Sequence, residues 1–269
     1  MANARLLYDA FIALYALSVV LFFVDAVHPR RALNRSALAL LFTSFVLETV
    51  FFLDRLQTSG AVPVLTSFDA LSLVAWMILA VTLVVDAFFR VHLVLFMANL
   101  TGFAMAAFAV FRPMGAVYHA PEGDLLYLHI GFALLSYTAF AFAFVFSLMY
   151  LIEHRFLREK RWNRWHFRSP PLDVLERLAY RSIILGLPLL LVAMVLGTIW
   201  GKLTVGRFVY LDPKLFSTTL LWGMYGVSLL LRVRSGWSGP RLVGYNVVCF
   251  SAVIVNLVVV GSFSLFHRV

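Results

Sequence analysis

Residues Leu125–Ile152 read LLYLHIGFALLSYTAFAFAFVFSLMYLI, a stretch that contains one histidine and no Asp, Glu, Lys or Arg. About 20 apolar residues in a helix are enough to span the hydrocarbon core of a bilayer. Inside lipid the backbone has to satisfy its own hydrogen bonds, so an apolar run of this length predicts a helix rather than a strand. The stretch therefore predicts a transmembrane helix with His129 near one end.

Seven further apolar stretches have similar lengths. They are approximately Leu6–Val27, Ser36–Phe52, Phe68–Phe88, Val91–Phe111, Ile183–Trp200, Leu215–Leu231 and Leu242–Phe266. The composition agrees, because 62% of the 269 residues are hydrophobic and 13% are charged, whereas soluble domains are about 25% charged. We predict an all-α integral membrane protein, a bundle of eight transmembrane helices in one polytopic domain over residues 1–269.

The Lys and Arg residues fall mostly on one side of this predicted bundle. The connections after the first, third, fifth and seventh spans carry 15 of the 22 Lys and Arg residues. The side richer in Lys and Arg is cytoplasmic, so we expect both termini on the outer side. Residues 154–181 form the most basic cytoplasmic loop, in which Ser169, Pro170 and Pro171 predict the start of a short amphipathic helix. The net charge of +9 thus reflects orientation in the lipid bilayer, and we expect no nucleic-acid partner.

Two histidines mark the outer ends of two predicted spans. His129 lies early in the fifth span, and His267 follows the eighth. Haem iron takes an imidazole on each axial side, and the flat ring packs against apolar and aromatic walls. Both histidines are therefore candidate iron ligands, and the alternative is that they are ordinary interfacial residues. No spacing of nucleophile, base and acid is present, so we expect a protein that is not an enzyme.

Glu48 is the deepest acidic residue of the predicted spans. An ionisable group at such depth is costly and usually faces a partner or a cavity. We expect it either to pair with Asn99 or Asn256 or to mark a pathway.

The chain carries Thr-Ile-Trp-Gly-Lys at residues 198–202 and Asp-Pro-Lys at residues 212–214, followed by Trp222 and Tyr225. This segment resembles the tryptophan-rich outer loop of the cytochrome c assembly superfamily of haem-handling membrane proteins. The resemblance implies that His129 and His267 are the iron ligands of a bound haem b.

The same resemblance implies further residues of the haem site. Its expected members beside the two histidines are Trp200, Phe208, Tyr210, Asp69 and Asp212. Asp69 follows an aromatic residue at the start of a predicted helix, where the family pattern implies that it hydrogen-bonds a histidine or holds the loop.

The chain departs from the superfamily in the outer loop. Val205, Val209 and Leu211 occupy positions at which cytochrome assembly proteins carry tryptophans. The flat surface for stacking is thereby lost, which argues against delivery of haem to an apocytochrome.

The similarity is greater to the HemX group of bacterial membrane proteins. It extends over Leu14–Ser18, Pro63–Thr66, Phe144–Leu151 and Gly261–His267. The resemblance implies a multi-pass protein of the bacterial plasma membrane that restrains the level of glutamyl-tRNA reductase. We expect the 154–181 loop either to contact that enzyme or an adaptor, or to be a basic surface that lies on anionic lipid.

Our leading hypothesis is a haem-binding regulator of haem biosynthesis of the HemX type. The alternative is haem transport or chaperoning for cytochrome c assembly. A third possibility is a structural membrane subunit without a cofactor.

Overall fold

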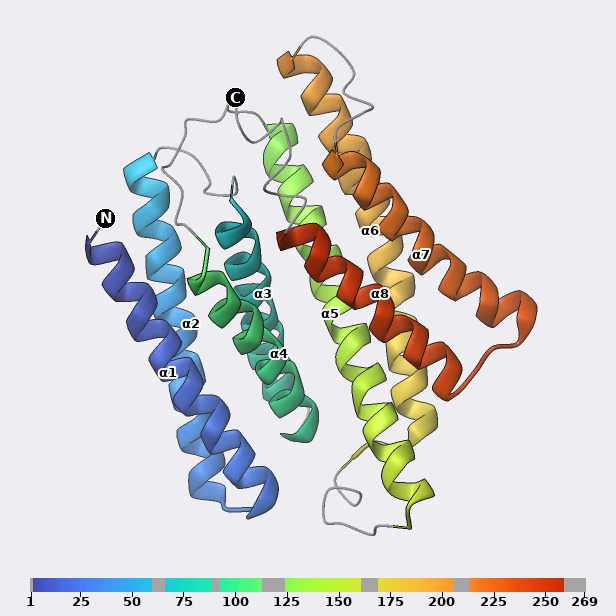
Figure 1. The fold of residues 1–269 in the computed structure, drawn as a ribbon. Helices are drawn as coiled ribbons and strands as arrows, with labels where there is room; N and C mark the ends of the chain where they lie inside the picture. Colours follow the sequence, from blue (N-terminus) through green and yellow to red (C-terminus); the bar gives the residue numbers. More distant parts are fainter. Residues whose placement is uncertain are drawn as a thin grey trace.

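The computed structural model describes residues 2–59, 66–88, 92–112, 124–160, 169–205 and 213–258. These residues form eight helices and contain no strand (Figure 1). The helices are α1 (Ala2–Val27), α2 (Arg31–Ser59), α3 (Ser67–Phe88), α4 (His92–Val110), α5 (Asp124–Arg158), α6 (Leu172–Val205), α7 (Pro213–Ser235) and α8 (Pro240–Val258). Each is long and apolar enough to cross a membrane. The predicted helical membrane bundle is confirmed, and the outward placement of both termini stays a prediction.

The beginning of α6 differs from the sequence prediction. A helix does begin after Pro171, whose carbonyl accepts hydrogen bonds from the amides of Val174 and Leu175. It then continues to Val205, so the prediction of a separate short amphipathic helix is wrong. The reason is that no proline interrupts the helix before Pro188, and the charged segment therefore runs directly into the span.

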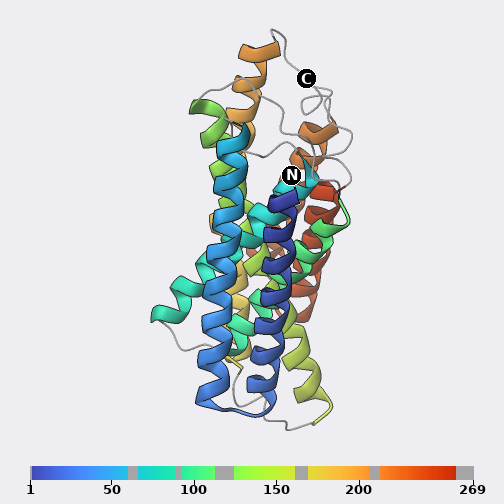
Figure 2. The same ribbon diagram turned by 90° about the vertical axis from the view of Figure 1, so that its left-hand side faces the viewer.

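The eight helices pack as two groups of four. α1 contacts α2 and α4, and α3 contacts α4 and α2. In the second group α5 lies along α6 and α8, and α7 contacts α6 and α8. Figure 1 shows α5 at the junction of the groups, where it also contacts α3 and α4, and Figure 2 shows α1 and α2 side by side from the other direction.

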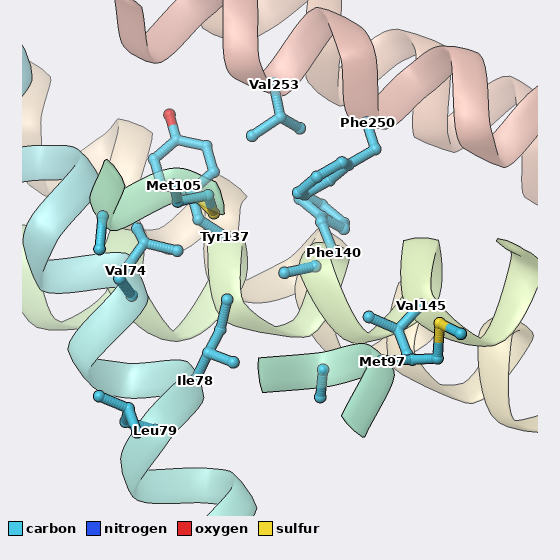
Figure 3. Packing of buried hydrophobic residues seen from close by; sticks show 14 of the residues in the cluster. Val74, Ile78, Leu79, Met97, Met105, Tyr137, Phe140, Val145, Phe250 and Val253 are labelled. Carbon is cyan, nitrogen blue, oxygen red and sulfur yellow. The ribbon is translucent and has the colours of Figure 1, made fainter. Parts of the chain in front are cut away.

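The seam between the groups is filled by apolar side chains of α3, α4, α5 and α8 (Figure 3). Two aromatic contacts hold α5 within the second group. Phe140 stacks on Tyr225 of α7 with ring centroids 3.9 Å apart, and Phe144 stacks on Phe250 of α8 at 4.5 Å. Close packing of this kind fixes side-chain positions, so the position of α5 relative to α7 and α8 is well defined.

The Leu172 end of α6 is hydrogen-bonded to the end of α7 and to the connection between α7 and α8. The Glu176 carboxylate accepts hydrogen bonds from Arg232 and from the Gly239 amide, both at 3.0 Å. The Arg232 guanidinium also lies 4.2 Å from the centre of the Tyr180 ring, a favourable cation–π arrangement. Gly239 has a φ of +65°, a conformation that favours glycine. We call Glu176, Tyr180, Arg232 and Gly239 the Glu176 cluster.

Candidate functional site

Small residues allow α5 to approach α6 closely. One face of α6 carries residues spaced by three or four, which keeps them in one stripe. The stripe consists of Leu175, Ala179, Ile183, Gly186, Leu190, Ala193 and Gly197. At Gly186 an added Cβ would lie 2.7 Å from the Phe140 ring, and the Ser136 hydroxyl donates to the Gly186 carbonyl at 2.9 Å. The stripe thus places backbone atoms of α6 within reach of side chains on α5.

His129 uses the same stripe near the other end of α6. It is half-buried in the second turn of α5, and its Nδ1 lies 2.6 Å from the Ala193 carbonyl oxygen. A carbonyl oxygen only accepts hydrogen bonds, so Nδ1 carries the proton and donates it. In the neutral ring the lone pair is then on Nε2. Among the described residues, no hydrogen-bond partner is found for Nε2.

Gly197 gives the His129 ring its place against α6. A Cβ added at Gly197 would lie 2.7 Å from Cε1 and 2.8 Å from Nδ1 of the ring. Real Cβ atoms essentially never come so close to a neighbouring heavy atom. Glycine at this position is therefore required for the observed position of the imidazole.

Two further groups lie near His129. Trp200 follows Gly197 by three residues, so the half-buried indole lies on the same face of α6, one turn further toward the end of the helix. Lys214, in the first turn of α7, is near enough for its charge to act on the His129 ring. The start of α5, the end of α6 and the start of α7 therefore bring an imidazole, an indole and an ammonium group into one region.

Asp69 serves the start of α3 rather than a histidine. One carboxylate oxygen accepts hydrogen bonds from the Thr66 hydroxyl at 2.7 Å and the Thr66 amide at 3.3 Å. The other oxygen lies 3.2 Å from Arg55 of α2, and both side chains are almost completely buried. Of the two roles expected for Asp69, its contacts favour holding the loop and the helix start.

The other predicted site residues lie outside the described residues. They are His267, Phe208, Tyr210 and Asp212. In the sequence, the described part of the chain that comes closest before His267 is the end of α8. There the Val258 carbonyl accepts a hydrogen bond from Ser67 at 3.3 Å. The start of α3, stabilised by Asp69, therefore lies beside the end of α8.

Glu48 does not form the pair expected from the sequence. Its side chain is fully buried, and neither carboxyl oxygen has a hydrogen-bond partner among the described residues. The Asn99 amide oxygen instead accepts from Tyr15 at 3.2 Å, and Asn256 donates to Thr218 at 3.2 Å. Pairing with an asparagine, the first of the two expectations, is wrong because both asparagines have hydroxyl partners on neighbouring helices. The other expectation, that Glu48 marks a pathway, stays a prediction.

The sequence did not indicate the roles of Ala193 and Gly197. The acceptor at Ala193 is a backbone atom, which has no signature in the residue type. The spacing of the stripe by three or four residues was the available sequence signal for these roles, since it places both residues on the face of α6 that meets α5.

Comparison with known proteins identifies the family. A family model described as "Cytochrome C assembly protein" matches residues 37–267. "Protein HemX" of Brevibacillus brevis is 36% identical over 95% of both chains, and "Protein HemX" of Bacillus subtilis (strain 168) is 33% identical over 99% of this chain and 98% of its own. "Cytochrome c biogenesis protein CcsA" of Chlamydomonas reinhardtii is 25% identical over 82% of this chain and 65% of its own. The resemblance drawn from the sequence is confirmed, and the chain belongs to the cytochrome c assembly protein family as a multi-pass membrane protein of the HemX type.

Proposed function

We propose that this protein binds haem b at the outer side of the membrane between His129 and His267. In this proposal it regulates haem biosynthesis by restraining the level of glutamyl-tRNA reductase. It acts as a binding protein and not as an enzyme, in the plasma membrane of a bacterium.

The fixed imidazole of His129 carries the haem part of this proposal. Histidines that bind a metal usually donate their other ring N–H to a carbonyl or carboxylate, which fixes the tautomer and raises the basicity of the ligating nitrogen. His129 donates from Nδ1 to the Ala193 carbonyl and keeps the Nε2 lone pair free of described partners. The residue therefore fits a haem, whose iron would accept that lone pair.

The surrounding residues suit the rest of a haem molecule. Trp200 supplies a flat apolar surface next to Gly197, and Phe208, Tyr210 and Asp212 belong to the same outer segment by sequence. Haem carries two propionate groups, and the Lys214 ammonium near His129 would pair with one of them. His267, nine residues after the end of α8 in the sequence, would be the second histidine that holds the haem.

The regulatory part of the proposal is supported by similarity to HemX over nearly the whole chain. The reductase or an adaptor would contact the basic 154–181 segment, of which residues 154–158 belong to α5 and residues 172–181 to α6. Both helices that meet at His129 therefore extend into the segment that would face the partner.

Haem transport or chaperoning for cytochrome c assembly is the second candidate function. The family description and the name of the CcsA relatives favour it. Val205, Val209 and Leu211, which replace tryptophans of that outer loop, favour retention of haem over delivery.

Visible absorption of the purified protein tests the haem site. After reconstitution with haem in detergent, we expect a Soret band typical of two imidazole ligands. His129→Ala and His267→Ala should each change the band, and the double variant should lose it, whereas His154→Ala, at the opposite end of α5, should keep it. Absence of any band in the parent protein would exclude the proposed site.

Deletion of the gene separates regulation from delivery. Regulation predicts a raised level of glutamyl-tRNA reductase with normal c-type cytochromes. Delivery predicts the opposite pattern, with lost c-type cytochromes and an unchanged reductase level. Complementation with the double histidine variant should fail in either case if bound haem is required.

A further inference from the structure

The contact between His129 and α6 consists of two backbone features one helical turn apart. In an α-helix the carbonyl of residue i accepts from the amide of residue i+4, and for Ala193 that residue is Gly197. A backbone carbonyl has two lone pairs, so the Ala193 oxygen can bond within the helix and also accept from His129. The imidazole thus lies against one turn of α6, with its acceptor at one end of the turn and the space left by a missing side chain at the other.

We propose that this turn of α6, made of the Ala193 carbonyl and the bare backbone at Gly197, is a positioning site that holds His129 as the Nδ1–H tautomer and presents Nε2 for ligation. Both are positioning residues, because they touch the imidazole and not the iron. The inference deepens the proposed function, on which its haem-related part rests.

The two parts of this turn have separate physical effects. The carbonyl selects the tautomer, because only a protonated Nδ1 makes a favourable contact at 2.6 Å. Gly197 sets the depth of the ring, because a methyl group there would occupy the place of Cε1 and Nδ1. A side chain at Gly197 would therefore also break the hydrogen bond to Ala193, since a displaced imidazole no longer reaches that carbonyl.

Gly186 offers a matched comparison on the same helix face. It also lets α5 approach α6, and a Cβ there would lie 2.7 Å from the Phe140 ring. Gly186 lies eleven residues, about three turns, before Gly197, on the same stripe and away from His129. If Gly197 served only helix packing, substitution at either glycine would have the same consequences.

The first experiment measures the tautomer without haem. Nuclear magnetic resonance of the haem-free protein, labelled with nitrogen-15 at histidine, distinguishes protonated from bare ring nitrogens. His129→Gln assigns the signal. We expect a protonated Nδ1 and a bare Nε2 in the parent and in Gly186→Ala, and loss of that pattern in Gly197→Ala. A protonated Nε2 in the parent, or an unchanged pattern in Gly197→Ala, would overturn the inference.

The second experiment adds haem to the same three proteins. Mutation of groups that orient a metal ligand typically weakens binding about 10–100-fold, so we expect Gly197→Ala to bind haem at least about tenfold more weakly than the parent and to shift its Soret band. Gly186→Ala and Gly226→Ala, the latter with open space around its Cβ position, should keep the parent band. Equal losses in Gly186→Ala and Gly197→Ala would reduce the role of Gly197 to packing and contradict the proposal.

The outcomes separate this inference from the proposed function. The expected tautomer in a parent protein that binds no haem would reject haem binding while leaving the positioning of His129 established. Normal haem binding by both the parent and Gly197→Ala would leave the proposed function standing and reject the positioning role.

Discussion

The two groups of helices bury polar residues in different ways. In α1–α4 the described buried residues include four ionisable ones, Asp25, Glu48, Arg55 and Asp69. Among the described residues of α5–α8, the one buried Asp, Glu, Lys or Arg is Glu153, near the end of α5. The other buried polar side chains of these helices are neutral.

Several neutral polar groups of the second half satisfy one another across helices. Asn256 of α8 donates to Thr218 of α7 and to Tyr137 of α5, and Ser228 donates to Asn246 at 2.6 Å. Buried charges are costly unless paired, whereas satisfied neutral groups are tolerated more easily. The first half thus contains a buried ion pair, Arg55–Asp69, whereas among the described residues of the second half the charge near the candidate ligand is that of the half-buried Lys214.

Breaking the Arg55–Asp69 pair should have the largest effect on stability. Arg55→Ala leaves Asp69 buried without its partner, and removal of one member of a buried pair typically costs about 3–5 kcal/mol. We expect that loss in the free energy of unfolding, measured by denaturant titration in detergent. Replacement of both residues, Arg55→Met with Asp69→Asn, should restore most of the stability, because the Asn side-chain oxygen can still accept from Thr66. A change of the Soret band in the folded fraction of Arg55→Ala would show that the two halves are not separable.

Replacement of Glu48 by an apolar residue should have the opposite effect and raise the free energy of unfolding. The Glu48 carboxyl group is fully buried without a hydrogen bond to a described residue, and burial of an unsatisfied polar group costs about 1–3 kcal/mol in mutational data. Glu48→Met should therefore raise the free energy of unfolding by about that amount, whereas Glu48→Gln, which keeps a polar group, should gain little. A loss of stability in Glu48→Met would mean that the carboxyl group has a role the contacts do not account for.

The smallest effect is expected in the neutral network of the second half. Thr218→Val removes the hydroxyl that accepts from Asn256, while Tyr137 remains as a partner. Loss of one such hydrogen bond typically costs about 0.5–1.5 kcal/mol. Thermal unfolding should detect it, with Thr219→Val as the control, because Thr219 bonds only within its own helix at Leu215. An effect as large as that of Arg55→Ala would remove the distinction between the halves.

Much of the fold was predictable from the sequence because apolar length decides it. The stretches from Leu6 and from Leu125 lie within helices of the structure, since a span needs no long-range information. The length of α6 was not predicted, because the charged residues after Pro171 indicated a short separate helix although nothing in them stops a helix before the span. In the site, His129 was found from its place at a span end. Its acceptor at Ala193 was not, because that hydrogen bond depends on how two distant helices pack.

The uninterrupted course of α6 has a mechanical consequence. At 1.5 Å per residue its 34 residues extend about 51 Å, well beyond the hydrocarbon core of about 30 Å. This one helix therefore carries the turn that supports His129 near one end and Glu176, of the Glu176 cluster, near the other. Pro188, close to the midpoint, removes one backbone hydrogen bond and makes this the point of easiest bending. A single continuous helix, rather than a series of loops, thus joins the Glu176 contacts to the turn that supports His129.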